Sequence, residues 1–378
     1  MKHANIPQNP FLLSGYVSPE FFCDREEESK KLISALRNGR NITLISPRRM
    51  GKTGLIRHLF HLMEQESQER CFLVDLYQTD SLTGLVSKIA KAVIGRLDTR
   101  GERFLKTMGT FFKSLRPVFT IDPQTGEPGF SIDIQPDYAE QSLAEIFTYM
   151  EQSGKECFFA FDEFQRVAEY EDRHVEALLR SHIQHLTNIH FVFSGSQRHV
   201  IENMFASATR PFYQSTQLMN LDCIGVDAYY QFASSKLEQH HQHMDKNTFE
   251  DIYHRLFGHT WYIQVLLNRL YEKGTTYIDK SDTEMVLKEI AMENEATFQT
   301  LLRLITPAQR KLLKAVAREG EVAEINGRNF ISRNNLGAAS TVNASAKSLL
   351  NKELLLEHHG KYSVYDRFLA IYLASEMV

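Results

Sequence analysis

Residues 41–63 read NITLISPRRMGKTGLIRHLFHLM. The segment Asn41–Ile45 is a short apolar, β-branched run, which predicts a strand, and from Thr53 to Met63 the apolar residues recur at helical spacing. Between the two lies a short segment that contains Pro47 and Gly51. The sequence therefore predicts a strand, a tight loop and a helix, in that order.

Gly51-Lys52-Thr53 indicates that this loop binds phosphate. In such loops backbone N–H groups and a helix dipole meet the phosphates, the lysine reaches the β- and γ-phosphates, and the hydroxyl reaches Mg²⁺. The usual pattern begins with glycine, where this chain has Ser46, so the turn is either mildly strained or has a negative φ there. A fortuitous strand–helix turn is the alternative. The candidate nucleotide-binding residues in the loop are Ser46, Pro47, Arg48, Arg49, Met50, Gly51, Lys52, Thr53 and Gly54.

Further apolar runs predict neighbouring strands at Cys71–Asp75, Cys157–Phe161 and His190–Ser194. Helical patterns separate them, and strands that are apolar on both faces form parallel sheets covered by helices on both sides. We therefore predict an α/β fold with a parallel-sheet core in residues 1–220. Two extended segments around a Pro- and Gly-containing turn predict a β-hairpin inserted at about 117–134.

Two acids, Asp162 and Glu163, follow the strand Cys157–Phe161 directly. A carboxylate at the end of a strand beside a phosphate-binding loop can hold Mg²⁺, and the next acid can orient an attacking water. The strand His190–Ser194 also ends in a polar cluster, in which Ser196 is the candidate to reach the γ-phosphate or the water. A plain turn rich in Ser and Gly is the alternative for that cluster. Together, the loop and the acids predict a nucleoside triphosphate site.

Two smaller domains are predicted after the core. Residues 221–300 show only helical periodicity, for example from Phe249 to Tyr271, which predicts a helical domain. Residues 301–378 show helical patterns at 307–318, 329–336 and 341–352, followed by two short strands around a His-His-Gly-Lys turn. Three helices followed by a hairpin are typical of a winged helix-turn-helix.

Residues 341–352 are the candidate DNA-recognition helix. Groove-facing candidates on this helix are Asn343, Ser345, Lys347 and Lys352, and Lys361 in the wing is placed to meet backbone phosphates. Residues 301–378 contain 11 Lys/Arg and 7 Asp/Glu, whereas the whole chain has a net charge of −4. The basic excess favours an anionic partner. The alternative is that the winged helix packs on the core or on a partner protein.

Composition limits the class of protein. Of the 378 residues, 43% are apolar and 24% charged, as in soluble globular proteins. No apolar run is long enough to span a membrane, the N-terminal residues lack the apolar run of a signal peptide, and the four cysteines lie far apart. We expect a cytoplasmic protein that has no membrane partner.

The motifs SPRRMGKT, FFAFDEFQ, FVFSGSQ and FGHTWYIQ, preceded by Asn9-Pro-Phe11 and Phe22-Cys-Asp-Arg-Glu-Glu27, resemble archaeal-type ATPases. These form a clade of AAA+-like P-loop NTPases of the STAND class, and the resemblance covers about residues 8–372. It implies an ATPase core, a helical lid at 221–300 and a C-terminal winged helix. It also implies ATP or ADP and Mg²⁺ as ligands.

The resemblance implies roles for single residues. Arg25 would lie near the adenine, Lys52 and Thr53 would bind phosphate and Mg²⁺, Asp162 would coordinate Mg²⁺, and Glu163 would be the general base. The chain departs from the family pattern at Ser46, at Asp24, where glycine is usual, and in Gly258-His259-Thr260, where the third residue is usually proline.

Two functions compete at this point. One is an ATP-hydrolysing switch, in which the nucleotide state controls the winged helix. The other is a DNA-binding regulator whose nucleotide site is structural or slow. Arg210 either acts on the γ-phosphate of a neighbouring subunit or holds a loop of its own chain, and the oligomeric state stays open.

Overall fold

The computed structural model describes residues 7–375 except 68, 95, 98–111, 122–127, 173 and 359. The chain divides into two compact units. One is Ser14–Ile224, and the other combines Gly225–Val378 with the N-terminal residues up to Leu13. None of the helices formed by the described residues is long and apolar enough to cross a membrane.

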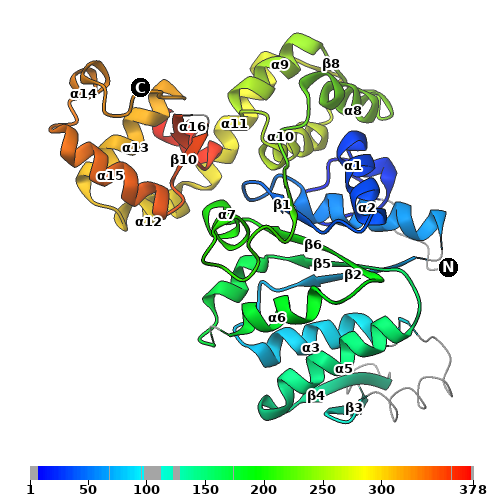
Figure 1. Ribbon diagram of the computed structural model, residues 1–378. Coiled ribbons are helices and arrows are strands. Elements are labelled where there is room, and N and C mark those ends of the chain that lie inside the picture. The colour runs from blue at the N-terminus through cyan, green and yellow to red at the C-terminus, as the bar shows by residue number, and fades with distance from the viewer. Residues whose placement is uncertain are drawn as a thin grey trace. The chain divides into compact units, whose positions relative to one another are not determined.

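The unit Ser14–Ile224 is built on a five-stranded sheet in the order β2-β5-β6-β1-β7 (Figure 1). Every neighbouring pair of strands is parallel, which confirms the predicted α/β fold. Because parallel strands share their direction, their carboxyl ends lie at one edge of the sheet. The strands are β1 (Ile42–Ile45), β2 (Arg70–Asp75), β5 (Cys157–Asp162), β6 (Ile189–Gly195) and β7 (Gln217–Asn220).

Helices cover both faces of this sheet (Figure 1). On one face, α1 (Glu26–Arg37) and α2 (Lys52–Glu66) pack on the strands through residues such as Leu36 and Leu59. The other face is covered by α3 (Leu82–Val93), α5 (Ala139–Gln152), α6 (Val175–Ile183) and α7 (Arg198–Ala206). A strand between two helical layers is buried on both sides, which explains why β5 and β6 are apolar at nearly every position.

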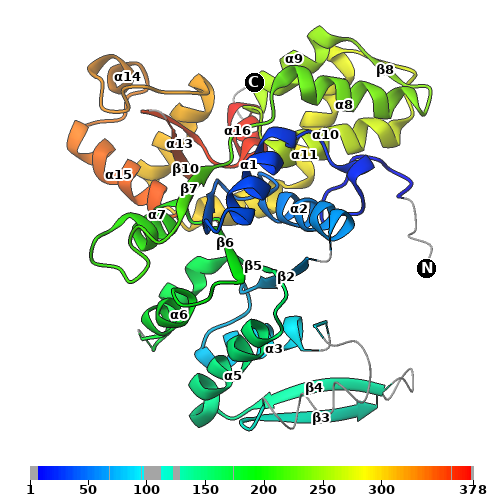
Figure 2. The same ribbon diagram turned by 45° about the vertical axis from the view of Figure 1, so that its right-hand side comes forward.

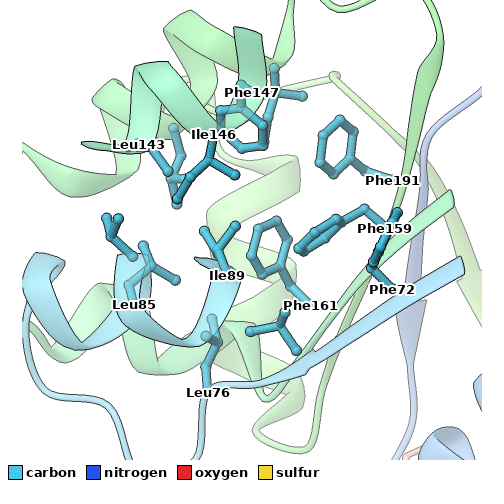
Figure 3. Packing of buried hydrophobic residues seen from close by; sticks show 14 of the residues in the cluster. Phe72, Leu76, Leu85, Ile89, Leu143, Ile146, Phe147, Phe159, Phe161 and Phe191 are labelled. Carbon is cyan, nitrogen blue, oxygen red and sulfur yellow. The ribbon is translucent and has the colours of Figure 1, made fainter. Parts of the chain in front are cut away.

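Aromatic side chains dominate the second of these faces (Figure 3). Phe159, Phe161 and Phe191 project from β5 and β6 and meet Ile89 of α3 and Ile146 of α5. The rings of Phe161 and Phe191 are stacked, with centroids 6.2 Å apart. Rings of this size bury large apolar areas, so they hold β5 and β6 rigidly at the centre of the sheet.

An antiparallel pair of strands extends from this layer, as Figure 2 shows beside α5. The pair consists of β3 (Leu115–Ile121) and β4 (Pro128–Ile134), with Leu115 opposite Ile134. The two strands lie at the position of the hairpin expected from the sequence at about 117–134, and residues 122–127 of its expected turn lie outside the described residues.

The second unit begins with a helical region. The helices are α8 (Val226–Glu238), α9 (Lys246–Arg255), α10 (Thr260–Lys273), α11 (Lys280–Glu293) and α12 (Glu295–Arg303). Two features differ from the purely helical pattern read from the sequence. The segment from Phe249 to Tyr271 is interrupted after α9, where Phe257 and Gly258 have φ angles of 55° and 64°. A short parallel pair, β8 (His243–Met244) with β9 (Tyr277–Ile278), also occurs.

The winged helix completes this unit. Its three helices are α13 (Pro307–Glu319), α14 (Arg328–Arg333) and α15 (Ala339–Asn351), and its wing is the antiparallel pair β10 (Leu355–His358) and β11 (Lys361–Val364). Thr306 and Gln309 form a capping box at the start of α13. The last helix, α16 (Arg367–Ser375), packs against α11 and α13.

Candidate nucleotide-binding site

The predicted site residues of the core follow the carboxyl ends of three strands of the sheet. The loop Ser46–Gly51 follows β1, Asp162 ends β5 and Ser194 lies at the end of β6. Since β1 and β5 both pair with β6, the three strand ends are neighbours at one sheet edge. The parallel register therefore brings together residues that are more than one hundred positions apart.

Lys52 is the first residue of α2 and is buried. Its Nζ donates hydrogen bonds to the carbonyl oxygens of Ser46 and Pro47 at 3.0 and 2.9 Å, and to Oγ of Ser46 at 3.1 Å. The lysine thus lies across the loop that precedes its own helix. Because the loop N–H groups and the helix N-terminus favour an anion at this place, the geometry suits a phosphate group.

Ser46 fits the loop without backbone strain. The residues of the loop with positive φ are Arg49 at 62° and Gly51 at 93°, and Ser46 is not among them. A Cβ atom is therefore acceptable at the first position of the pattern. Of the other loop residues, Met50 is buried, Pro47 and Gly51 are half-buried, and Arg48 and Arg49 are exposed.

Burial lowers the pKa of Lys52 to about 8, although the charges of Glu163 and Asp162 act in the opposite direction. The positive charge of Arg48 lowers it further. An anionic ligand beside Nζ would stabilise the charged amine, because opposite charges favour the ionised form. The amine is therefore suited to a ligand with several negative charges.

Asp162 joins the strand end to the phosphate-binding loop. Thr53 Oγ1 donates to its Oδ2, and Ser194 Oγ donates to its Oδ1 at 2.5 Å. Asp162 is only 3% exposed, so the two donors compensate for the burial of its charge. The sequence pattern placed Ser194 in a polar cluster but gave it no role, because its contact with Asp162 depends on the pairing of β5 with β6.

Glu163 follows with a φ of 56°, which turns its side chain away from the direction of the strand. Its Oε2 accepts hydrogen bonds from Ser196 Oγ at 2.7 Å and from Gln165 Nε2 at 2.5 Å. Ser196 therefore contacts Glu163, the candidate general base. The sequence analysis predicted that Ser196 reaches the γ-phosphate or the attacking water. Gln165 was present in the motif FFAFDEFQ, but nothing in the spacing indicated that it would fold back onto Glu163.

Arg25 lies at the N-terminus of α1. It is buried, and its guanidinium donates to Glu28 Oε1 and to the carbonyl oxygen of Asp222, both at 2.7 Å. It therefore ties the segment after β7 to α1. The preceding Asp24 has a φ of 52°, so aspartate here adopts the left-handed conformation that glycine would take easily.

Arg210 forms an ion pair with Glu176 at the start of α6. Burial raises the pKa of Glu176, and the charge of Arg210 opposes that shift. Both residues belong to the same compact unit. This contact favours the reading in which Arg210 holds a loop of its own chain.

In the other unit, the turn Phe257-Gly258-His259 contacts Arg367, the first residue of α16. The guanidinium of Arg367 lies 4.0 Å from the centre of the Phe257 ring, and Phe368 packs edge-on against Tyr262. Arg367 is 5% exposed. Its charge is therefore stabilised largely by the ring face and by its neighbours within this unit.

The candidate DNA-contacting residues of α15, together with Lys352, which follows it, divide into two groups. Asn343, Lys347 and Lys352 are exposed, but Ser345 is buried, so the prediction that Ser345 faces a groove is wrong. The reason is the helical period: Ser345 lies three residues after Val342 and four before Leu349, on the buried face. Lys361 in the wing forms an ion pair with Glu321 at 2.9 Å.

A parallel sheet with a lysine-bearing loop between strand and helix, and an acid at the end of a neighbouring strand, is typical of P-loop NTPases. The chain belongs to a family of ATPase domains found predominantly in Archaea, which residues 22–266 match. Residues 296–375 match a family described as a probable winged helix domain. No curated protein matches the sequence significantly.

Solved structures share the fold over nearly the whole chain. A Walker-type ATPase of Pyrococcus abyssi is 20% identical, with a TM-score of 0.65 over 96% of this chain and 99% of that one. The ORC2 protein of Aeropyrum pernix, solved in ADPNP–ADP complexes, is 14% identical, with a TM-score of 0.59 over 97% and 95%. The ORC1 protein of the same organism, solved with DNA, is 12% identical, with a TM-score of 0.53 over 98% and 97%.

Proposed function

We propose that this protein binds ATP and hydrolyses it in a Mg²⁺-dependent reaction, as a nucleotide-controlled switch. The hydrogen bond between Thr53 and Asp162 carries the proposal, because it joins the phosphate-binding helix to the acids at the end of β5. The family of ATPase domains supports the reaction. Structures of a fold relative with ADPNP and ADP are consistent with the ligand.

Lys52 and the loop would hold the phosphates. Its Nζ would exchange the carbonyl oxygens of Ser46 and Pro47 for phosphate oxygens, which carry full negative charge. The N-terminus of α2 adds a favourable dipole at the same place. Arg25, next to Asp24 and Cys23, is our candidate for the neighbourhood of the adenine.

Thr53 and Asp162 fit a magnesium ion. A hydroxyl and a carboxylate oxygen are the hard ligands that Mg²⁺ prefers, and this ion uses one or two protein carboxylates together with substrate phosphates. Thr53 Oγ1 and Asp162 Oδ2 already lie in contact, so both oxygens point to one place. A bound Mg²⁺ would neutralise charge on the phosphate oxygens.

Glu163 would act as the general base. Its carboxylate lies at the same sheet edge, and Ser196 holds one of its oxygens. A carboxylate in this position can accept a proton from the water that attacks the γ-phosphate. The protein supplies positioning and charge, and the bond that breaks joins the β- and γ-phosphates of ATP.

The switch function would use the second unit. The segment that resembles the family's lid motif is Gly258-His259-Thr260, and the preceding Phe257 contacts Arg367 at the start of the last helix. A change in the conformation of this turn would therefore alter a direct contact with α16. This arrangement supports the assignment to the STAND class of nucleotide-controlled switches.

The test compares Glu163→Gln with the wild type. The variant removes the base but keeps the shape of the side chain, so we expect ATP affinity within about 3-fold and a turnover number lower by about 10²- to 10⁴-fold. Phosphate release and nucleotide binding, both with Mg²⁺, measure the two effects. Glu151→Gln, at an exposed residue of α5, is the matched control. Equal turnover by Glu163→Gln and wild type would contradict the proposed role of Glu163.

The second candidate function is a winged-helix DNA-binding regulator with a structural or slow nucleotide site. The observation that favours it is the exposed Asn343 and Lys347 on α15 and the exposed Lys352 directly after it, in a region with a basic excess. A fold relative was solved with DNA. A salt-dependent gel shift on duplex DNA that does not change with ATP would support this function over the switch.

A further inference from the structure

Gln165, like Asp162 and Ser194, is an almost completely enclosed polar residue near the strand ends, but one of its polar atoms has no hydrogen-bond partner among the described residues. It is 2% exposed and lies in a 3₁₀-helix, Phe164–Glu169, between the core residues Phe164 and Val167. Its Oε1 is buried and accepts no hydrogen bond from any described residue. A buried amide that is only partly satisfied is unfavourable for folding, so core packing alone does not explain a glutamine here.

Within the described part of the chain, the side chain of Gln165 forms its one hydrogen bond with Glu163. Its Nε2 donates to Oε2 at 2.5 Å, and Ser196 Oγ donates to the same oxygen at 2.7 Å. Among the described residues, neither donor reaches Oε1 of Glu163. Two donors on one oxygen fix the rotation of a carboxylate and leave the lone pairs of its other oxygen available.

The neighbouring strand makes room for this arrangement. A Cβ atom on Gly195 would lie 2.3 Å from Oε1 of Gln165 and 2.4 Å from Cγ1 of Ile201. The contact with Gln165 is far closer than real Cβ contacts, so a larger residue at 195 would displace the amide. The φ of 56° at Glu163 completes the arrangement by turning the glutamate toward the amide two residues later.

We propose that Gln165 is a positioning residue for hydrolysis: with Ser196 it anchors Oε2 of Glu163, so that Oε1 accepts the proton of the attacking water. The inference rests on the proposed ATPase function. In the reaction the water oxygen bonds to the γ-phosphorus, the bond from that phosphorus to the β–γ bridging oxygen breaks, and the water proton passes to Oε1. Gln165 itself exchanges no proton.

The test is Gln165→Met, which keeps the length and volume of the side chain but removes the donor. We expect the turnover number to fall about 10-fold, the size expected for loss of one hydrogen bond to a charged group, with KM for ATP within 2-fold. Because methionine buries no amide, the melting temperature should stay the same or rise. A merely structural role predicts the reverse, a lower melting temperature and an unchanged turnover number.

Two variants complete the experiment. Gln184→Met, at an exposed glutamine of the same unit, is the control and should behave as wild type. Gln165→Asn keeps the amide but shortens its reach by one methylene, and should lose turnover like Gln165→Met. If Gln165→Met fails to fold, the turnover number of Gln165→Asn tests the positioning role in its place.

The outcomes separate this inference from the function on which it rests. If wild type hydrolyses ATP and both Gln165 variants keep its turnover within 2-fold, the positioning role is overturned and the ATPase function stands. If wild type binds ATP no better than Lys52→Ala and releases no phosphate, the proposed function fails, and the role of Gln165 fails with it.

Discussion

The nucleotide site and the winged helix use polar side chains in opposite ways. At the ends of β5 and β6, Asp162 and Ser194 are buried and bonded to one another. On the winged helix, Lys361 and Arg333 are exposed and paired with Glu321 and Glu319. Burial of polar groups is unfavourable because they lose their hydration, so a cluster of buried polar groups indicates a function. Exposed ion pairs, in contrast, contribute little to the free energy of folding. The difference makes the first region the stronger functional assignment.

Lys52→Ala tests the buried side of this comparison and should give the largest effect. The change removes a buried cation that lies across the phosphate-binding loop, and loss of such a charge from an anion site costs about 2–5 kcal/mol. We expect ATP affinity to fall by about 100-fold or more. Titration calorimetry measures it, with the exposed Lys31→Ala on α1 as control. Wild-type affinity in Lys52→Ala would show that the loop does not bind the phosphates.

The pH dependence of ATP binding gives the next largest effect. The pKa of Lys52 is lowered by burial to about 8 from 10.5, and bound phosphates would raise it again. Above about pH 8, binding must therefore take up a proton, so affinity falls as the pH rises. Between pH 7 and pH 9 we expect a loss of about tenfold.

The control for this pH effect is Lys52→Arg, because the guanidinium does not titrate in this range. Its affinity can differ from that of wild type, but its slope with pH should be close to zero. The same slope in both proteins would assign the pH dependence to another group.

Lys347→Ala tests the exposed residues of the winged helix and should give the smallest change in affinity. An exposed lysine that meets a DNA phosphate should contribute a few-fold to affinity and about 0.9 to the salt slope. Lys361→Ala should change both less, since that lysine is paired with Glu321. Gel shifts at several salt concentrations measure the difference. Equal losses for the two variants would contradict the comparison, and no DNA binding at low salt would eliminate the regulator function.

The sequence predicted the core well because its signals are local. Strands buried on both faces are mostly apolar, and a phosphate-binding loop needs glycine, lysine and a hydroxyl in fixed order. Four of the five parallel strands were therefore predictable from residues 41–63 and three further apolar runs, whereas the largely exposed edge strand β7 was not. The acids at Asp162 and Glu163 were predictable for the same reason, as they follow such a run directly.

Other parts depend on contacts that no local pattern records. Ser194 and Gln165 reach the acids only through strand register and a positive φ at Glu163. The strands β8 and β9 have two residues each, too few for a periodic signal. The break after α9 involves a phenylalanine, Phe257, in a left-handed conformation, for which the residue type gives no warning.

The stack of Arg367 on Phe257 affects how the molecule can be divided. Phe368 and Tyr372 of α16 are buried, the first against Tyr262 in the helical region and the second against Phe298 of α12. A fragment that ends before α16 would expose Tyr262 and Phe298, against which these rings pack. An isolated winged helix would instead expose Phe368 and Tyr372. Proteolysis should therefore cut the native chain near the exposed Gly225, at the boundary of the two units, more readily than near residue 300.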